Sequence, residues 1–224
     1  MSRRRSRVSL FRDRADAARQ LAEVLRGREL RQPLVLGIPR GGVVTGAVLA
    51  RGLGADLDIV LARKLRVPGF PEVALGAVAE TGEVYLNERF EPTVALQKYL
   101  AEERDYQMSE IARRGRLFRS VRPPASIAGR SVIVTDDGIA TGSTALAALQ
   151  AVRAQQPHEL ILAVPVAAPD SLARLSSYCD DVVCLLNPPE FQAVGQFYQD
   201  FATVEDAEVV ELLGDFAPAE AARP

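Results

Sequence analysis

The chain has 224 residues, 48% of them hydrophobic and 25% charged, which is enough to bury the core of one globular domain. Its formal net charge of −2 gives no overall attraction to nucleic acid, and no apolar stretch reaches the roughly 18 residues that a membrane span needs. The single histidine, His158, has no partners at metal-ligand spacing, and the two cysteines indicate reduced thiols. We therefore expect a cytoplasmic protein without histidine or zinc chemistry.

Strand and helix patterns alternate along the chain, which predicts an α/β fold with a mostly parallel, twisted sheet flanked by helices. A first helix is expected from the capping residue Asp13 to about Gly27. Further helices are expected over residues 41–52, 92–117, from the turn at 141–144 to about 154, from 169 onward, and over 205–213. Strands are expected over residues 33–38, 58–62, 84–86, 132–134, 160–166 and 182–186.

The segment between the second and third expected strands is rich in proline and glycine, which predicts a long mobile loop at about residues 63–82. The whole chain, residues 1–224, is expected to form one domain with its core at about residues 33–186. Residues 187–216 are expected to form a small hood over that core, and residues 217–224 to be disordered.

The most informative segment is VIVTDDGIATGST, residues 132–144, which combines a buried strand, two acids and a small-residue turn. Asp136 and Asp137 follow the strand, at the sheet edge where ligands of open α/β folds bind. The turn that opens the next helix presents N–H groups that favour a phosphate, from Thr141, Gly142, Ser143 and Thr144. The combination indicates a sugar phosphate, whereas the plainer alternative is a capped helix beside two solvated acids.

This segment resembles the phosphoribosyl-diphosphate (PRPP) signature of type I phosphoribosyltransferases, in which two acids and three spacer residues precede Thr-Gly-x-Thr. The resemblance extends over about residues 33–201, and the layout is similar to that of bacterial phosphoribosyltransferases of unassigned acceptor. It implies that Thr141–Thr144 hold the 5′-phosphate of PRPP and that Asp136 and Asp137 hold the ribose hydroxyls, directly or through Mg²⁺. Magnesium is expected to be bound mainly through the phosphates of PRPP.

Two further segments fit a PRPP site. The turn GIPRGG contains Arg40, Gly41 and Gly42, and the resemblance implies that it binds the pyrophosphate group; its alternative reading is tight strand-to-helix packing. Arg63 and Lys64 end the next strand and are expected to neutralise pyrophosphate oxygens and to take part in catalysis with the two acids. The segment RKLRVPGF, which begins with these two residues, resembles the loop entry of adenine-type members, in which this loop closes over the reacting centre. Glu72 or Glu80 could act there, and an exposed charge is the alternative for each.

The tail NPPEFQAVGQFYQDF, from Asn187 to Phe201, resembles the late segment of hypoxanthine-type members. That likeness implies that Phe191 stacks on the base and that Asp200 helps to bind magnesium, while packing of the hood is the alternative for its aromatic residues. Ala140 occupies the position that is an acid in 6-oxopurine enzymes and an alanine in adenine-type members. The tail and Ala140 therefore indicate different bases, and the sequence does not identify the acceptor.

The function we expect is transfer of a 5-phosphoribosyl group from PRPP to a base-like nitrogen acceptor with release of pyrophosphate, as in nucleotide salvage, by a homodimer. A regulatory protein that senses PRPP or a nucleotide with little turnover is the main alternative. A hydrolase or phosphorylase acting on a ribosyl phosphate is a third. The balanced charge favours small-molecule substrates over nucleic acid as the partner, and no membrane partner is expected.

Overall fold

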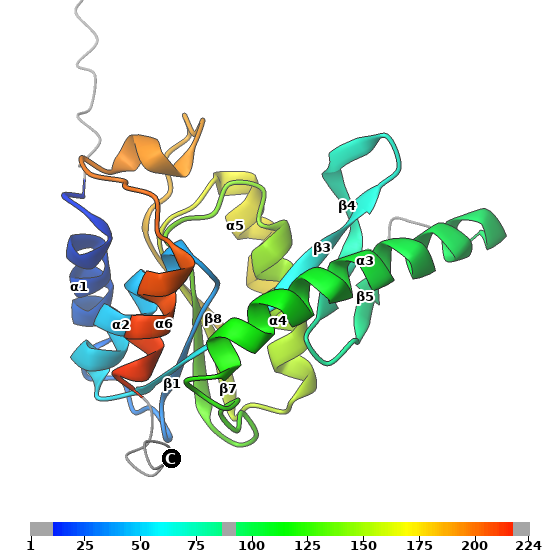
Figure 1. The fold of residues 1–224 in the computed structure, drawn as a ribbon. Coiled ribbons are helices and arrows are strands. Elements are labelled where there is room, and N and C mark those ends of the chain that lie inside the picture. Colours follow the sequence, from blue (N-terminus) through cyan, green and yellow to red (C-terminus); the bar gives the residue numbers. More distant parts are fainter. Residues whose placement is uncertain (1–10, 87–92, 217–224) are drawn as a thin grey trace, which may run out of the picture.

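The computed structural model describes residues 11–86 and 93–216, and the ribbon in Figure 1 shows their arrangement. The expected disordered tail, residues 217–224, lies outside this part. The strands are β1 (Leu34–Gly37), β2 (Asp56–Ile59), β3 (Ala62–Val67), β4 (Phe70–Ala79), β5 (Val84–Leu86), β6 (Ser131–Thr135), β7 (Glu159–Val166) and β8 (Asp181–Leu186). The helices are α1 (Arg14–Leu25), α2 (Gly41–Leu53), α3 (Val94–Arg119), α4 (Ser143–Ala154), α5 (Pro169–Leu175) and α6 (Asp206–Gly214), with short 3₁₀ helices η1 (Ser176–Tyr178) and η2 (Val194–Phe197).

The larger sheet has five strands in the order β2-β1-β6-β7-β8, and every neighbouring pair is parallel. This confirms the predicted α/β fold with a mostly parallel sheet. Strand order reverses between β1 and β6, because the chain moves outward to β2 on one side and to β7 on the other. In such sheets the turns after the two central strands diverge and leave room for a ligand at their carboxyl ends.

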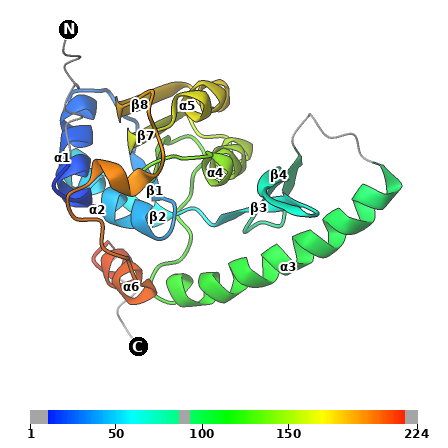
Figure 2. The same ribbon diagram turned by 90° about the horizontal axis from the view of Figure 1, so that it is seen from above.

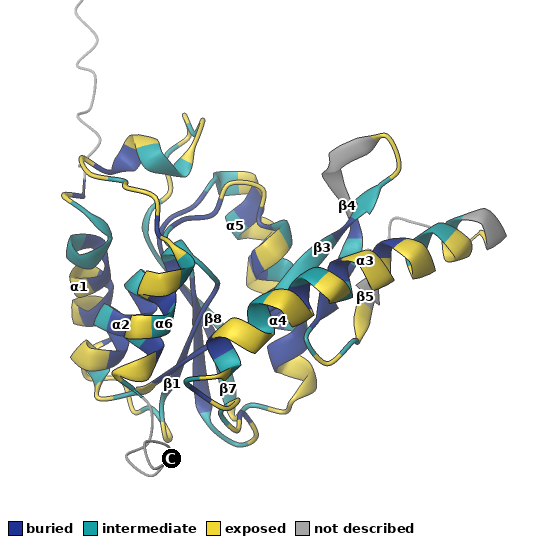
Figure 3. Cartoon of the chain, in the orientation of Figure 1, coloured by how far each residue is buried: buried dark blue, intermediate teal, exposed yellow. Residues whose placement is uncertain are grey.

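The sheet separates two helical layers, and its central strands β1 and β6 are buried on both sides (Figure 3). Val35 and Ile133 face the layer that contains α1 and α2, while Leu36 and Val134 face α4 and α5. Successive side chains of a strand point to opposite faces, so a continuous apolar run is what a doubly covered strand requires. The continuous apolar run that predicted β6 is therefore explained by the position of this strand in the middle of the fold.

Residues 63–82 differ from the expected irregular loop: they form most of an antiparallel sheet in the order β3-β4-β5. Pro68 and Gly69 make the tight turn between β3 and β4, and Gly69 has a φ of 75°, which glycine adopts without steric cost. Leu65 and Leu75 are buried in the same apolar cluster as Val35. The prolines and glycines thus mark a turn and irregular pairing inside a hairpin. The strand expected over residues 58–62 is divided, because β2 ends at Ile59 and β3 begins at Ala62.

Helix α3 lies beside this hairpin and extends well past the larger sheet, as Figure 2 shows. Its amino-terminal cap is Thr93, and the expected start at residue 92 lies outside the described residues. Its last residue, Arg119, donates to Asp58 of β2 at 2.5 Å and to Glu80 after β4 at 2.8 Å. This one guanidinium therefore joins the long helix to both sheets.

The first part of the hood (residues 187–216) binds the segment just before α1, at the top of Figure 1. The Phe11 N–H donates to the Phe197 carbonyl at 2.9 Å, and the Gln199 N–H donates back to the Phe11 carbonyl at 2.8 Å. Its last part, α6, contacts α2 and α3. Within the residues that the structure describes, no helix combines the length and apolar character needed to cross a membrane.

Candidate functional site

The turns after β1 and β6 meet at the point where the strand order reverses. A Cβ atom added to Gly41 would lie 1.9 Å from Asp137 Oδ2, and one added to Gly42 would lie 2.7 Å from the Thr135 carbonyl oxygen. Distances below about 3 Å are impossible for real side chains, so only glycine lets the two turns approach this closely. The glycine turn (residues 37–42) and the signature turn (residues 136–144) therefore lie in close contact, and their joint role as a site stays a prediction.

The two acids of the signature turn lie in different surroundings. The Asp137 N–H donates to Asp136 Oδ1 at 2.8 Å, which fixes the carboxylate of Asp136 against its own backbone. Burial, together with the nearby negative charge of Asp137, raises the pKa of Asp136 well above its usual range. A carboxyl held in this way is ready to accept hydrogen bonds or to meet a cation, either of which would offset the cost of its charge.

Asp137 has a partner that the sequence analysis missed, which is Arg14 at the first position of α1. Arg14 Nε lies 2.8 Å from Asp137 Oδ2, and only 11% and 15% of the two side chains are exposed. The same guanidinium donates to the Ala202 carbonyl at 2.8 Å and stacks over the Phe201 ring at 3.9 Å. Nothing in the spacing of these residues signals the pairing, because it depends on how α1 and the hood meet.

The hood closes directly on the signature turn. The Tyr198 hydroxyl donates to the Asp137 carbonyl at 2.5 Å, and burial raises the pKa of this phenol. A Cβ atom on Gly138 would lie 2.5 Å from Val194 of η2, so the turn and the hood are in close contact. Any substrate held by the two acids would thus lie beneath residues of the hood.

The end of the signature turn has the geometry expected of a phosphate cradle. Gly142 has a φ of 71° and precedes Ser143, where α4 begins without a side-chain cap. The Ser171 hydroxyl donates to the Ala140 carbonyl at 2.6 Å, and Arg174 donates to the Thr141 carbonyl. Because no side chain caps α4, the N–H groups in its first turn are oriented to bind an anion, and the two donors to the carbonyls hold the turn in shape.

The cations predicted from the sequence occupy two places. Arg63 and Lys64 line a cavity of about 290 Å³ together with Pro39 of the glycine turn and Thr144 of the signature turn; this is the cationic cavity. Arg40 extends instead toward α6, where its Nη1 lies 3.4 Å from Glu205. The structure therefore brings β3 to the same site as the two turns.

The remaining candidates lie around this site in varied surroundings. Phe191 packs against Phe197 with ring centroids 5.3 Å apart. Asp200 is exposed and accepts from the Ala202 N–H at 3.2 Å, and it lines a cavity of about 220 Å³ beside Arg14. Glu80 is engaged by Arg119. Glu72 lies in β4, and its side chain is outside the part of the chain that is described.

The carboxylate oxygens at the site could bind a magnesium ion only if a substrate supplied further oxygen ligands. Among the residues described, no three His, Cys, Asp or Glu side chains gather closely enough to hold a metal ion. The oxygens of Asp136 and Asp137 are of the type that Mg²⁺ prefers, but two carboxylates leave most of an octahedral shell to water and phosphate oxygens. The site thus suits magnesium that arrives with a phosphorylated ligand.

The chain also matches known proteins across most of its length. Residues 9–201 match the family model described as "Phosphoribosyl transferase domain". The chain belongs to this phosphoribosyl transferase family. It is 44% identical over 218 residues to proteins of two Mycobacterium tuberculosis strains named "Putative phosphoribosyl transferase", covering 95% of this chain and 49% of each relative. The chain thus spans about half the length of these relatives.

Solved structures agree with this assignment. The crystal structure of TT1426 from Thermus thermophilus matches with a TM-score of 0.86 and 44% identity, covering 93% of this chain and 100% of that one. AQ2163 from Aquifex aeolicus, with 12% identity and a TM-score of 0.50, shares the fold alone. A shorter sequence match links 26% of the chain to a uracil phosphoribosyltransferase of Clostridioides difficile, covering 28% of that enzyme at 39% identity. The likeness to TT1426 supports the fold, and none of these likenesses assigns an acceptor.

Proposed function

We propose that this protein transfers the 5-phosphoribosyl group of PRPP to a nitrogenous, base-like acceptor and releases pyrophosphate. The observation that supports this most directly is the contact between Gly41 and Asp137, which joins an anion-binding turn to a pair of acids. A ligand with a phosphate, two ribose hydroxyls and a diphosphate has one chemical group for each part of the combined site. Membership of the family supports the same reaction class.

Each part of the site has a role in this proposal. The 5′-phosphate lies on Thr141–Thr144, at the positive end of the α4 dipole. Asp136 and Asp137 accept from the ribose hydroxyls, and Arg14 keeps the carboxylate of Asp137 in place. Gly41, Gly42, Arg63 and Lys64 hold the diphosphate, whose charge bound magnesium would also neutralise. Arg40 joins them when its side chain turns away from Glu205.

The reaction then needs little covalent chemistry from the protein. The bond between C1′ and the diphosphate oxygen breaks, and pyrophosphate departs with the electron pair, which leaves positive charge on C1′. The acceptor nitrogen forms the new bond to C1′ from the opposite face, and its proton passes to an oxygen of the departing pyrophosphate or to water. The protein contributes by positioning the two partners, by stabilising the charge of the leaving group and by excluding water beneath the hood.

The acceptor is proposed only as a class, a nitrogenous base or a similar amine. Phe191 is the proposed stacking residue from the hood, and Asp200 is the weaker proposed metal ligand. A homodimer is proposed from family likeness. The conflicting signals of Ala140 and the hood leave purines and pyrimidines as candidates to be screened.

The first experiment is calorimetric titration of the full chain with PRPP in the presence of Mg²⁺. The variant Asp136→Asn/Asp137→Asn should bind PRPP about a hundredfold more weakly or not at all, because it loses two charged acceptors. Asp105→Asn, an exposed acid on α3, is the matched control and should bind like the unmodified protein. Purines, pyrimidines and simple amines are then screened for pyrophosphate release.

The outcomes separate the competing functions. Magnesium-dependent binding with pyrophosphate release for one acceptor supports the transferase. Binding without turnover of any acceptor favours a sensor, and release of inorganic phosphate favours a hydrolase or phosphorylase. Absence of magnesium-dependent PRPP binding to the unmodified protein would remove the proposal.

A further inference from the structure

The cationic cavity is shared between β3 and α3, two elements that are distant from the signature turn in sequence. Besides Arg63 and Lys64 it is lined by Arg66 of β3 and by Gln107 and Arg114 of α3. The helix therefore presents a third guanidinium to a space that the glycine turn and the signature turn also border. A cavity with so many cations favours a multiply charged anion.

Three arginines of this cavity differ in what they bind. Arg66 Nε lies 2.8 Å from the carboxylate of Glu103, and Arg63 Nε donates to the side-chain carbonyl of Gln107 at 2.6 Å. Arg114 Nε, in contrast, is buried and has no hydrogen-bond partner among the described residues. A buried guanidinium N–H that finds no acceptor costs free energy, which an incoming anion would recover.

The charges of the cavity add to this cost. Burial and the nearby positive charge of Arg114 lower the pKa of Arg63. Two guanidinium groups that repel each other beside a cavity become favourable neighbours once a polyanion lies between them. Thr144, at the phosphate-binding end of the site, and Pro39, in the glycine turn, fix where that polyanion would lie.

We propose that Arg114 is a substrate-binding residue that α3 contributes to the cationic cavity, where its guanidinium pairs with a diphosphate group. The inference rests on the proposed function, since the diphosphate is either that of PRPP or the pyrophosphate released from it. It assigns to the long helix a direct part in binding, in addition to its structural contacts.

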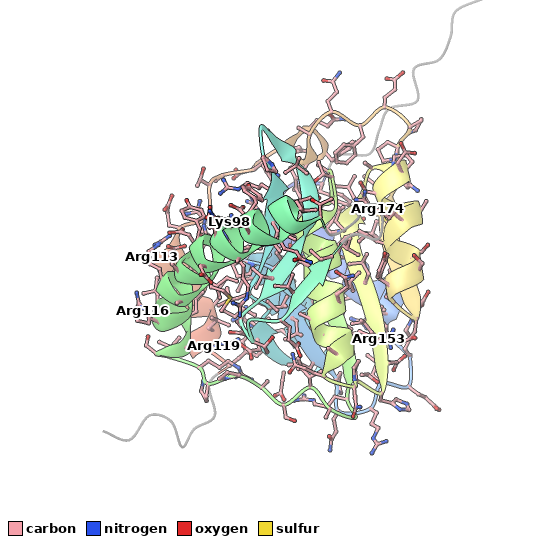
Figure 4. The ribbon with its side chains drawn as sticks, turned by 90° about the vertical axis from the view of Figure 1, so that its right-hand side faces the viewer. Lys98, Arg113, Arg116, Arg119, Arg153 and Arg174 are labelled. Carbon is pink, nitrogen blue, oxygen red and sulfur yellow. The ribbon has the colours of Figure 1, made fainter. Side chains whose placement is uncertain are left out.

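The neighbours of Arg114 on the same helix provide matched controls. Arg113 and Arg116 are exposed and lie along the outer side of α3 in Figure 4. Arg113 pairs only loosely with Glu110, at 3.5 Å. Neither residue lines the cavity, so removing either charge tests the effect of net charge alone.

The test is calorimetric titration of the full chain with inorganic pyrophosphate and, separately, with PRPP, both with Mg²⁺. Arg114→Gln should weaken pyrophosphate binding about tenfold to a hundredfold, as expected for loss of a charge-assisted pair. Arg113→Gln and Arg116→Gln should each change it less than about twofold, and Arg114→Lys should restore part of the loss. Thermal unfolding of each variant shows whether the chain remains folded.

Weaker binding of both ligands to Arg114→Gln, with unchanged controls, supports a site for the diphosphate of the substrate. Weaker binding of pyrophosphate alone supports a site for the product. Equal binding by Arg114→Gln and Arg113→Gln overturns the inference and leaves the proposed function intact. If the unmodified protein binds no pyrophosphate and Arg114→Gln binds PRPP as well as the unmodified protein does, the inference is also overturned. Pyrophosphate binding that depends on Arg114, without any PRPP binding, counts against the proposed function and keeps Arg114 as a diphosphate-binding residue.

Discussion

At the scale of single residues, the two acids of the signature turn are held by different means. Asp137 has an enclosed partner in Arg14, whereas Asp136 is held by a backbone N–H and has the unfavourable charge of Asp137 beside it. An enclosed carboxylate with a paired guanidinium keeps a fixed position. Asp136, whose pKa is raised, has no such cationic partner among the described residues and is available to bind a ligand. The site therefore combines one positioned acid with one that is less stable in its charged form.

Replacing Arg14 by methionine should lower the free energy of unfolding by about 2 kcal/mol, because it leaves the Asp137 carboxylate enclosed without its partner. Urea denaturation gives the value. Arg12→Met is the control, since 68% of the Arg12 side chain is exposed and its pair with Asp16 should contribute less than about 0.5 kcal/mol. A similar loss for both variants would contradict the structural importance of the Arg14–Asp137 pair.

Replacing Asp136 by asparagine should stabilise the fold at neutral pH while weakening PRPP binding. The raised pKa means that the folded chain binds more protons at Asp136 than the unfolded chain does. Stability is therefore lost as pH rises above about 4, the usual value for aspartate, toward the raised value. The asparagine variant should lack this loss, so its advantage in free energy of unfolding should grow over that window.

Denaturation of both proteins at a series of pH values measures that difference. Asp137→Asn provides the contrast, because it breaks the pair with Arg14 and should lower stability at neutral pH. A constant difference between Asp136→Asn and the unmodified chain across pH would show that Asp136 has an ordinary pKa.

At the scale of elements, the hairpin β3–β4 and the helix α3 support each other. Glu103 and Gln107 of α3 hold the arginines of β3, and Arg119 holds Asp58 and Glu80. Arg63 and Lys64, which line the cationic cavity with the glycine turn, therefore lie on β3, and α3 holds that strand on one side. Helix α4, which begins at the signature turn, also contacts both β3 and β4.

Arg119→Met should lower the free energy of unfolding by about 3 kcal/mol, since 3% of the Asp58 side chain and 16% of the Arg119 side chain are exposed. Hydrogen exchange should show faster exchange of amides in β4 and at the carboxyl end of α3. The exposed Arg116, replaced by methionine, should change stability by no more than about 0.5 kcal/mol. Unchanged protection of β4 in the Arg119 variant would contradict this joining role.

At the scale of the whole molecule, one apolar cluster connects the two sheets. It contains Val35 and Ile133 of the larger sheet, Leu65 and Val78 of the hairpin, and Phe118 of α3. A continuous core predicts that the hairpin and the larger sheet unfold together. We therefore propose that the described residues form a single folding unit, in line with the one domain expected from the sequence.

Leu65→Ala should lower the stability of the entire chain by about 2–5 kcal/mol, because it leaves a cavity in that core. Circular dichroism and tyrosine fluorescence, followed in urea, should give coincident transitions that both shift. Leu86→Ala on β5, where 40% of the residue is exposed, should have a much smaller effect. Two separate transitions would show that the hairpin unfolds independently.

The sequence by itself determined the parallel sheet, the boundaries of most elements and the position of the signature turn. Its apolar runs indicate burial on both sides of the central strands. Its glycines indicate close approach, of the Asp137 side chain at Gly41 and of the backbone at Gly42. These are local properties, because the pattern of a few neighbouring residues expresses each of them. The same local rules misread residues 63–82, since a Pro-Gly turn inside a hairpin and an irregular loop have similar composition.

Only the tertiary structure decided which distant residues lie beside the signature turn and the cationic cavity. Arg14 reaches Asp137 because the hood binds the start of α1, and Arg114 reaches the cationic cavity because α3 lies along the hairpin. Both contacts join segments far apart in the chain, and neither leaves a periodic pattern or a fixed spacing in the sequence. Long-range pairing is set by the packing of whole elements, so the partners of a charged residue become visible only when those elements are in place.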